Sequence, residues 1–234
     1  MRRDVLYPAL LLLLCTLGWT AWPSSPAAEA GAGAVAYLGR PSPTASQGGT
    51  AAVHVPPLQA PPLEPAPGNP VGVIATSMGE ITVELFKEHA PVSVENFRQY
   101  AQEGFYDGTI FHRVIPKFMI QGGGYTPALV EKPTRPPILN EATNGLRNVR
   151  GTLGMARRQS LRSATSQFYI NVADNRMLDH TGYSPMDFGY AVFGRVLAGM
   201  EVVDAIAGVP TGVQGGMQDV PLQPVTITSI RIKP

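Results

Sequence analysis

The chain has little of the chemistry on which many enzymes and metal proteins rely. Its 234 residues include a single cysteine, Cys15, and only 15% of them are charged. One cysteine excludes an internal disulfide framework and a zinc site built from several cysteines. Lys and Arg number 18 against 17 for Asp and Glu, and no basic block stands out. With a net charge of +1, we expect no nucleic-acid partner.

The common catalytic and cofactor motifs are also missing. Gly122–Gly124 lack the lysine and the helix that follow in a phosphate-binding loop. Ser166 precedes a strand-like segment and does not lie on a nucleophile elbow. The histidines are scattered without the spacing of metal ligands, at His54, His89, His112 and His180. We therefore expect neither a metal nor a cofactor.

The first 22 residues are typical of a targeting segment. Arg2 and Arg3 precede an apolar run from Val5 to Trp22, which predicts a signal peptide or a membrane anchor at residues 1–22. The arginines predict that the chain behind them is exported. Residues 27–30 (AAEA) offer a cleavage site, so a cleaved signal and a retained anchor both stay open. A lipid on Cys15 is a third alternative.

Residues 23–70 have a composition that a folded domain cannot use. They hold 11 of the 23 prolines but only three charged residues and one tyrosine. Such a segment buries too little apolar surface to offset its ordering entropy, so it is predicted to be a disordered, partly extended linker. The remaining residues 71–234 have the size of one ordinary domain with a core of its own.

This domain is predicted to be mostly β. Strand-like segments separated by turn glycines outnumber the two helical ones, at 91–103 and 199–210. The expected strands are a hairpin over 71–86 and segments at 110–115, 118–121, 152–156, 167–172, 190–196 and 225–232. Such a pattern favours an antiparallel barrel or sandwich with helices as caps. Pairing of the last strand with the first would close the sheet.

The apolar stretch 109–124 contains two unexpected polar residues, Arg113 and Gln121. A buried guanidinium is costly unless something uses its donors. Strand alternation places Phe111 and Arg113 on one face and His112 on the other. Two interpretations stay open at this point: Arg113 forms a structural ion pair while the rest of the stretch is barrel core, or it belongs to an apolar groove with a few convergent donors.

Four motifs, FHRVIPKFMIQGGGYT, GTLGMAR, SQFYI and YAVFGRV, closely resemble the cyclophilin family of peptidyl-prolyl cis–trans isomerases. The resemblance covers residues 73–233, and SATSQFYINVADNRMLDH with DFGYAVFGRV resembles its bacterial periplasmic-type branch. It implies a closed eight-stranded antiparallel barrel capped by two helices, with the active groove on its outer face. It also implies a monomeric isomerase without cofactor that rotates X–Pro bonds in proline-containing polypeptides and assists their folding. With the exported topology, we expect it in the periplasm or at the extracytoplasmic face of the inner membrane.

The resemblance also implies the site residues. Arg113 would be the catalytic donor to the proline nitrogen, and Gln121 would hold the substrate backbone or support Arg113. The implied substrate-binding residues are Phe118, Met119, Ala156, Arg157, Gln167, Tyr169, Met177, Leu178 and Tyr190. Among these, the residues implied to cradle the proline ring are Phe118, Met119, Tyr169 and Leu178.

The chain departs from the family pattern at several of these positions. Met177 stands where many members have a tryptophan that donates a hydrogen bond to cyclosporin. We therefore expect weak cyclosporin binding with turnover largely kept, and nanomolar inhibition would contradict this. Tyr190 replaces a common histidine, and Tyr169 replaces a phenylalanine, adding a hydroxyl at the edge of the pocket. Three arginines make one rim basic, which would favour acidic residues near the proline or form only a solvated face: Arg157, Arg158 and Arg162.

Two other functions remain as alternatives. A cyclophilin-like domain without meaningful catalysis would grip proline-containing segments as a scaffold or chaperone, and loss of Arg113 would be its signature. A lipocalin-like barrel would carry a lipophilic ligand and would need an internal cavity. The presence of Arg113 favours the isomerase.

Overall fold

The computed structural model describes residues 64–233. The predicted signal or anchor at residues 1–22 and most of the predicted linker lie outside this range. Within it, no helix combines the length and the apolar character needed to cross a membrane.

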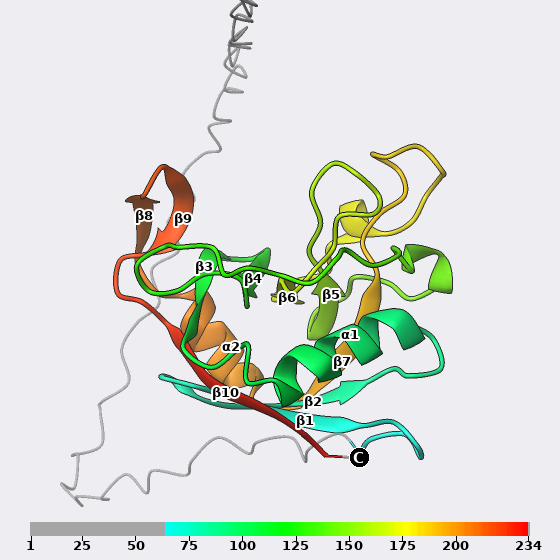
Figure 1. Ribbon diagram of the computed structural model, residues 1–234, viewed down its shortest axis with the longest axis horizontal. Helices are drawn as coiled ribbons and strands as arrows, with labels where there is room; N and C mark the ends of the chain where they lie inside the picture. Colours follow the sequence, from blue (N-terminus) through cyan, green and yellow to red (C-terminus); the bar gives the residue numbers. More distant parts are fainter. Residues whose placement is uncertain (1–63, 234) are drawn as a thin grey trace, which may run out of the picture. The chain divides into compact units, whose positions relative to one another are not determined.

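Eight strands close into a barrel in the order β1-β10-β3-β4-β6-β5-β7-β2, and every neighbouring pair is antiparallel (Figure 1). The last strand pairs with the first, so the predicted closure and the predicted eight-stranded barrel are confirmed. The barrel strands are β1 (Val71–Thr76), β2 (Gly79–Leu85), β3 (Thr109–Ile115), β4 (Met119–Gly122), β5 (Thr152–Met155), β6 (Phe168–Asn171), β7 (Val192–Ala198) and β10 (Thr226–Lys233).

Two helices accompany the barrel, as predicted: α1 (Pro91–Gln102) and α2 (Met200–Ala207). Helix α1 packs against β10 and β7, and α2 packs against β2, β3 and β4. Two short 3-10 turns complete this part of the chain, η1 (Ala142–Asn144) and η2 (Arg176–Leu178).

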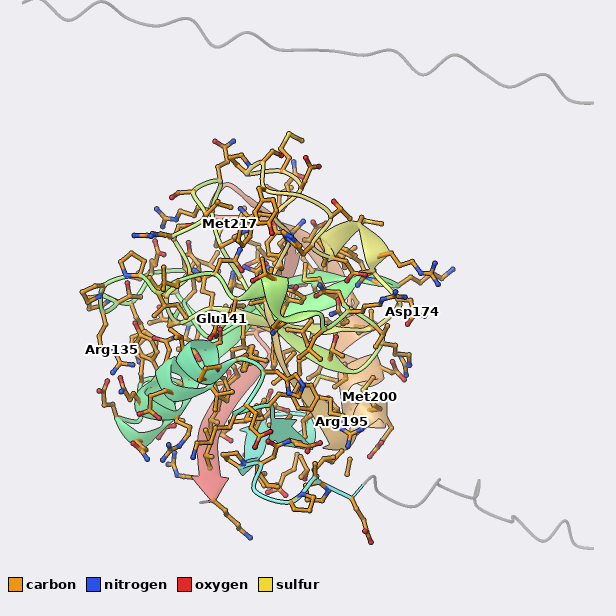
Figure 2. The ribbon with its side chains drawn as sticks, turned by 90° about the vertical axis from the view of Figure 1, so that its right-hand side faces the viewer. Arg135, Glu141, Asp174, Arg195, Met200 and Met217 are labelled. Atoms are coloured by element: carbon orange, nitrogen blue, oxygen red, sulfur yellow. The ribbon has the colours of Figure 1, made fainter. Side chains whose placement is uncertain are left out.

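The start of α1 is capped from a distance. Pro91 occupies the first turn, where its missing N–H costs nothing, but Ala90 at the N-cap has no side-chain acceptor. The Glu141 carboxylate, labelled in Figure 2, accepts hydrogen bonds from Val92 N at 3.0 Å and from Ser93 N and Oγ at 2.7 Å each. Its negative charge also suits the positive end of the helix dipole. The loop before η1 is thereby fixed to α1.

Aromatic rings dominate the core where α1 meets the barrel. The ring of Phe97 lies 5.2 Å from Tyr106 and 5.3 Å from both Phe168 and Phe193, measured between centroids. All four residues are fully buried. Side chains fill the interior of an eight-stranded barrel of this kind, so the described residues give no support to the lipocalin-like alternative, which needs an internal cavity.

A two-stranded hairpin stands outside the barrel and is not predicted from the sequence. It consists of β8 (Thr211–Gln214) and β9 (Met217–Pro221) and packs against β3 (Figure 1). Its strands are short and polar, and two glycines with positive φ, Gly215 and Gly216, form its turn. Local hydrophobic alternation is too weak here to indicate strands.

Residues 64–70, the end of the predicted linker, are held on the barrel. The carboxylate of Glu84, fully buried, accepts hydrogen bonds from Ala66 N at 2.7 Å, Asn69 Nδ2 at 2.8 Å and Arg195 Nε at 2.7 Å. Burial alone would raise the pKa of Glu84, but these hydrogen bonds and the charge of Arg195 lower it overall. Arg195 also donates to the carbonyl of Glu64 at 3.3 Å. The prediction of a disordered linker reaching residue 70 is therefore wrong for these seven residues.

This attachment is tested by Asn69→Ala in the full chain. The substitution removes one donor from a buried carboxylate, so the free energy of unfolding should fall by about 1–3 kcal/mol. Urea unfolding measures it. Glu64→Ala is the control, because only the backbone carbonyl of Glu64 contacts Arg195, and it should leave stability unchanged. Equal stability of both variants and wild type would contradict the role of Glu84.

Candidate functional site

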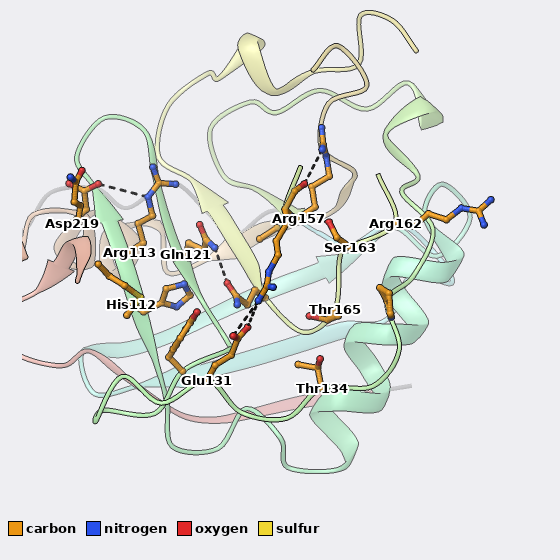
Figure 3. Close-up of a pocket in the computed structure, with 17 residues that line it drawn as sticks. His112, Arg113, Gln121, Glu131, Thr134, Arg157, Arg162, Ser163, Thr165 and Asp219 are labelled. Atoms are coloured by element: carbon orange, nitrogen blue, oxygen red, sulfur yellow. Dashed lines mark hydrogen bonds and ion pairs between the residues drawn. The ribbon is translucent and has the colours of Figure 1, made fainter. Parts of the chain in front are cut away.

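A groove of about 630 Å³ lies over β3 and β4 and is walled by the loop between β5 and β6 and by β9 (Figure 3). Both strands present residues to it from the barrel surface. Of the residues predicted for the site, the groove is lined by Arg113, Gln121, Ala156, Arg157 and Gln167. The structure thus brings these five together although they span 55 positions of the chain.

Arg113 is not buried. Its side chain is 44% exposed, and its ion-pair partner within residues 64–233 is Asp219, whose Oδ2 lies 3.8 Å from Arg113 Nε (Figure 3). This separation is too long for a hydrogen bond. The guanidinium donors therefore stay available to a ligand in the groove, and the Arg113 side chain is not part of the barrel core.

A β-bulge at His112 sets the direction of both neighbouring side chains. Phe111 pairs with Gly122 and Arg113 pairs with Gln121, so His112 is an extra residue in β3. The bulge breaks the alternation of strand faces, and His112 and Arg113 both line the groove. The prediction that His112 faces away from Arg113 is therefore wrong.

His112 is held neutral. Its side chain is buried, with 5% exposure, and its ring lies 4.6 Å from that of Tyr125. Burial and the nearby charge of Arg113 lower the pKa of His112 from 6.5 to about 4. Its Nδ1 has no hydrogen-bond partner in the part of the chain that the structure describes. A neutral imidazole therefore adjoins the permanent charge of Arg113 at pH 7.

The two glutamines of the groove bind each other. Gln121 Nε2 donates to Gln167 Oε1 at 3.0 Å. The Gln121 side chain is therefore directed at Gln167 and not at Arg113. Gly124 makes room for this pair, because a Cβ there would lie 2.5 Å from Gln167 Cγ. The Gln121 amide is thereby oriented before any ligand binds.

The residues predicted to cradle a proline ring are not among those that line this groove: Phe118 lies in the turn before β4, Met119 on β4, Tyr169 on β6 and Leu178 in η2. Met119 and Tyr169 are buried, and Phe118 and Leu178 are half-buried. The Tyr169 hydroxyl donates to Asn148 Oδ1 at 2.6 Å, and burial raises the pKa of Tyr169 well above its usual value. The expectation of a hydroxyl at the edge of the pocket is therefore wrong, because this hydroxyl is directed into the protein.

A buried network of asparagines supports these positions. Asn171 Nδ2 donates to Thr152 Oγ1 at 2.9 Å, and Asn175 Nδ2 donates to Asn171 Oδ1 at 2.7 Å and to the carbonyl of Phe118 at 2.8 Å. Asn148, the acceptor of the Tyr169 hydroxyl, belongs to the same network through Asn171 at 3.3 Å. Phe118 and Tyr169 are thus fixed by one set of buried hydrogen bonds.

Two of the three arginines of the predicted basic rim, Arg157 and Arg158, bind other groups of the protein. Arg157 donates to the carbonyls of Gly189 at 3.0 Å and Pro185 at 2.9 Å, and its guanidinium lies 4.7 Å from the Tyr190 ring. Arg158 pairs with Glu131 at 3.1 Å. Arg162 is exposed. A structural role therefore explains Arg157, which holds the loop before Tyr190.

Comparison with known proteins identifies the fold family. Residues 72–232 match the family described as cyclophilin type peptidyl-prolyl cis-trans isomerase. The chain belongs to this family. A peptidyl-prolyl cis-trans isomerase of Acinetobacter baylyi is 58% identical over 158 residues, which are 68% of this chain and 82% of that protein. One of Streptomyces antibioticus is 59% identical over 157 residues, or 67% and 95% of the two chains.

Solved cyclophilins share the architecture. A cyclophilin-type isomerase of Cryptosporidium parvum, crystallised in the presence of the dipeptide Ala-Pro, superposes with a TM-score of 0.60 at 26% identity and covers 70% of this chain and 99% of that chain. With the family match and these relatives, the present chain is a peptidyl-prolyl cis–trans isomerase.

The groove residues that the sequence analysis does not assign to the site include His112, Glu131 and Asp219. His112 is placed by a bulge, Glu131 by the loop after β4, and Asp219 by the hairpin beside β3. Alternation within β3 gives no sign of the bulge, and nothing in the local sequence links Asp219 to Arg113.

Met177, predicted to contact substrate, is 78% exposed and does not line the groove. Its effect on cyclosporin binding stays a prediction. Within residues 64–233 no cluster of side chains could hold a metal ion.

The buried neutral His112 predicts a pH-dependent stability. Its pKa is about 4 in the folded chain against 6.5 in the reference state, so the unfolded chain takes up the proton first as the pH falls. The free energy of unfolding should drop between pH 6.5 and about 4, by about 3 kcal/mol at about 1.4 kcal/mol per unit. Urea unfolding at several pH values measures the slope.

His112→Gln should flatten this slope, because glutamine does not titrate. The exposed His89 provides the control, and His89→Gln should retain the wild-type slope. An unchanged slope in His112→Gln would show that other groups cause the acid sensitivity.

Proposed function

We propose that this cyclophilin is an exported isomerase that accelerates rotation about X–Pro bonds of exported proteins and so assists their folding. The chemistry rests on one observation: Arg113 lines an open groove, and among the described residues its guanidinium has only a long ion pair with Asp219, so its N–H donors are available to a substrate. The proposed location, the periplasm or the extracytoplasmic face of the inner membrane, is supported by Arg2, Arg3 and the apolar run that follows. The proline-rich segment after this run would serve as a spacer.

The reaction needs a hydrogen-bond donor and no nucleophile. Rotation about X–Pro crosses a barrier of about 20 kcal/mol because amide resonance is lost. In the twisted transition state the proline nitrogen regains its lone pair and becomes a better acceptor than in either planar state. A donor aimed at this nitrogen stabilises the transition state selectively. Arg113 is that donor in the proposed mechanism.

The other residues of the site would hold the substrate and exclude water. Met119, Phe118 and Leu178 supply apolar surface for the proline ring, and the hydrogen bond from Arg113 is stronger where water is displaced. Gln121, oriented by Gln167 at 3.0 Å, would bind the substrate backbone. Arginine stays protonated at any working pH, so the rate of the chemical step should depend little on pH while the fold is intact.

A proline-binding scaffold or chaperone module remains the alternative at the level of biological role. It would use the same groove to grip unfolded segments, with its effect independent of Arg113. The guanidinium N–H donors of Arg113, which make no hydrogen bond within the described residues, favour a catalytic role. A module that only binds gains little from a donor that would stabilise the twisted amide of the transition state.

Arg113→Ala tests the proposed mechanism. With an Ala-Pro peptide, kcat/KM should fall at least about tenfold, equivalent to about 1.4 kcal/mol of lost transition-state stabilisation. Arg98→Ala, on the exposed face of α1, is the control and should retain full activity. Equal rates of the Arg113 variant and wild type, with circular dichroism unchanged, would refute the proposed role.

Export is tested with residues 1–70 fused to alkaline phosphatase that lacks its own signal, in a Gram-negative host. The phosphatase should be active, because its disulfides form only outside the cytoplasm. Leu11→Arg with Leu13→Arg places charges in the apolar run and should abolish this activity. An inactive wild-type fusion that is expressed normally would count against export.

A further inference from the structure

We propose that Asp219 is a positioning residue for Arg113. Its carboxylate approaches the guanidinium at Nε, with Oδ2 at 3.8 Å from Nε, and it forms no hydrogen bond with the two terminal nitrogens. The role rests on the proposed function of Arg113 as donor to the proline nitrogen. Asp219 itself would not contact the reacting atoms.

The backbone places Asp219 by a local irregularity. In the hairpin, Gly212 pairs with Val220 and Gln214 pairs with Met217. Two residues of β9, Gln218 and Asp219, therefore stand opposite the single residue Val213, which defines a bulge. Asp219 adopts a φ of +59°, a left-handed conformation that costs energy for a residue with a side chain, although aspartate tolerates it better than most.

This hairpin forms a wall of the groove. Strand β9 packs against β3, which carries Arg113, and the groove is lined on this side by Met217, Gln218 and Asp219. A left-handed residue in a bulge directs its side chain differently from its neighbours in the strand. Figure 3 shows the result: Asp219 faces Arg113, and the ion pair is drawn between them.

The ion pair is too loose to serve stability. Both side chains are partly exposed, 44% for Arg113 and 40% for Asp219, so water screens their attraction. Arg150 and Asp204 have similar exposure but form two direct hydrogen bonds of 2.8 and 2.7 Å. Arg150 and Asp204 thus form a directly hydrogen-bonded pair, whereas Arg113 and Asp219 do not. Asp219 instead attracts the guanidinium without occupying its N–H donors.

Orientation matters for this arginine more than for a surface charge. Its long side chain has many rotamers, whereas a donor to the proline nitrogen must lie within hydrogen-bond reach of it. The other acidic residue of the groove, Glu131, is paired with Arg158 at 3.1 Å. Asp219 is thus the acidic groove residue that can restrict Arg113.

Asp219→Asn tests the proposal in the full-length chain. Asparagine tolerates the left-handed backbone and keeps the size of the side chain but removes its charge. With an Ala-Pro peptide, kcat should fall about fivefold, the scale of one exposed ion pair, while KM changes less than about twofold. Asp219→Gly, which relieves the backbone strain, should show the same loss of kcat with the melting temperature maintained.

Asp204→Asn is the matched control. It breaks an ion pair of similar exposure on α2, away from the groove, and should leave kcat unchanged. In an Arg113→Ala background, Asp219→Asn should have no further effect, because it acts through Arg113.

Three results would overturn the proposal: unchanged kcat in Asp219→Asn, a rise in KM alone, or an equal loss in the Arg113→Ala background. Each of these leaves the proposed function intact if Arg113→Ala alone is slow. A fast Arg113→Ala enzyme would instead refute the proposed function, and this inference with it.

Discussion

The bulge at His112 is the constraint on which the groove depends. Regular alternation would send His112 and Arg113 to opposite faces of β3. The extra residue opposite β4 turns both toward one groove and leaves a neutral, buried imidazole beside a permanent cation. Strand β3, which carries the bulge, is one of the eight strands of the closed barrel. The groove is therefore shaped by a local irregularity in the strand pairing of the barrel.

A second rigid element supports the apolar side of the site. The asparagine network ties Phe118 and Tyr169 to buried partners, so the pocket is set by hydrogen bonds beneath it as well as by packing. Arg157 fixes the loop that ends at Tyr190 by donating to carbonyls at 2.9 and 3.0 Å. Arg113 differs from these groups, because among the described residues its guanidinium has only the long ion pair with Asp219.

Local signals predicted most of the fold, and long-range contacts account for the failures. The hairpin predicted over 71–86 and the helix start at Pro91 depend on neighbouring residues, and the structure confirms both. The cap of α1 by Glu141, 48 positions from Ser93, left no local sign. The attachment of residues 64–70 depends on Glu84, buried in another strand. For the site, family motifs located Arg113 and Gln121, whereas the two bulges that orient His112 and Asp219 follow from strand pairing alone.

The central claim is that Arg113 reaches the proline nitrogen of a bound substrate. A crystal structure of this chain with the dipeptide Ala-Pro tests it most directly. We expect the proline ring against Phe118 and Met119, with a terminal nitrogen of Arg113 within about 3.5 Å of the proline nitrogen. A dipeptide bound in the groove with its proline nitrogen far from Arg113, or bound elsewhere on the barrel, would contradict the account.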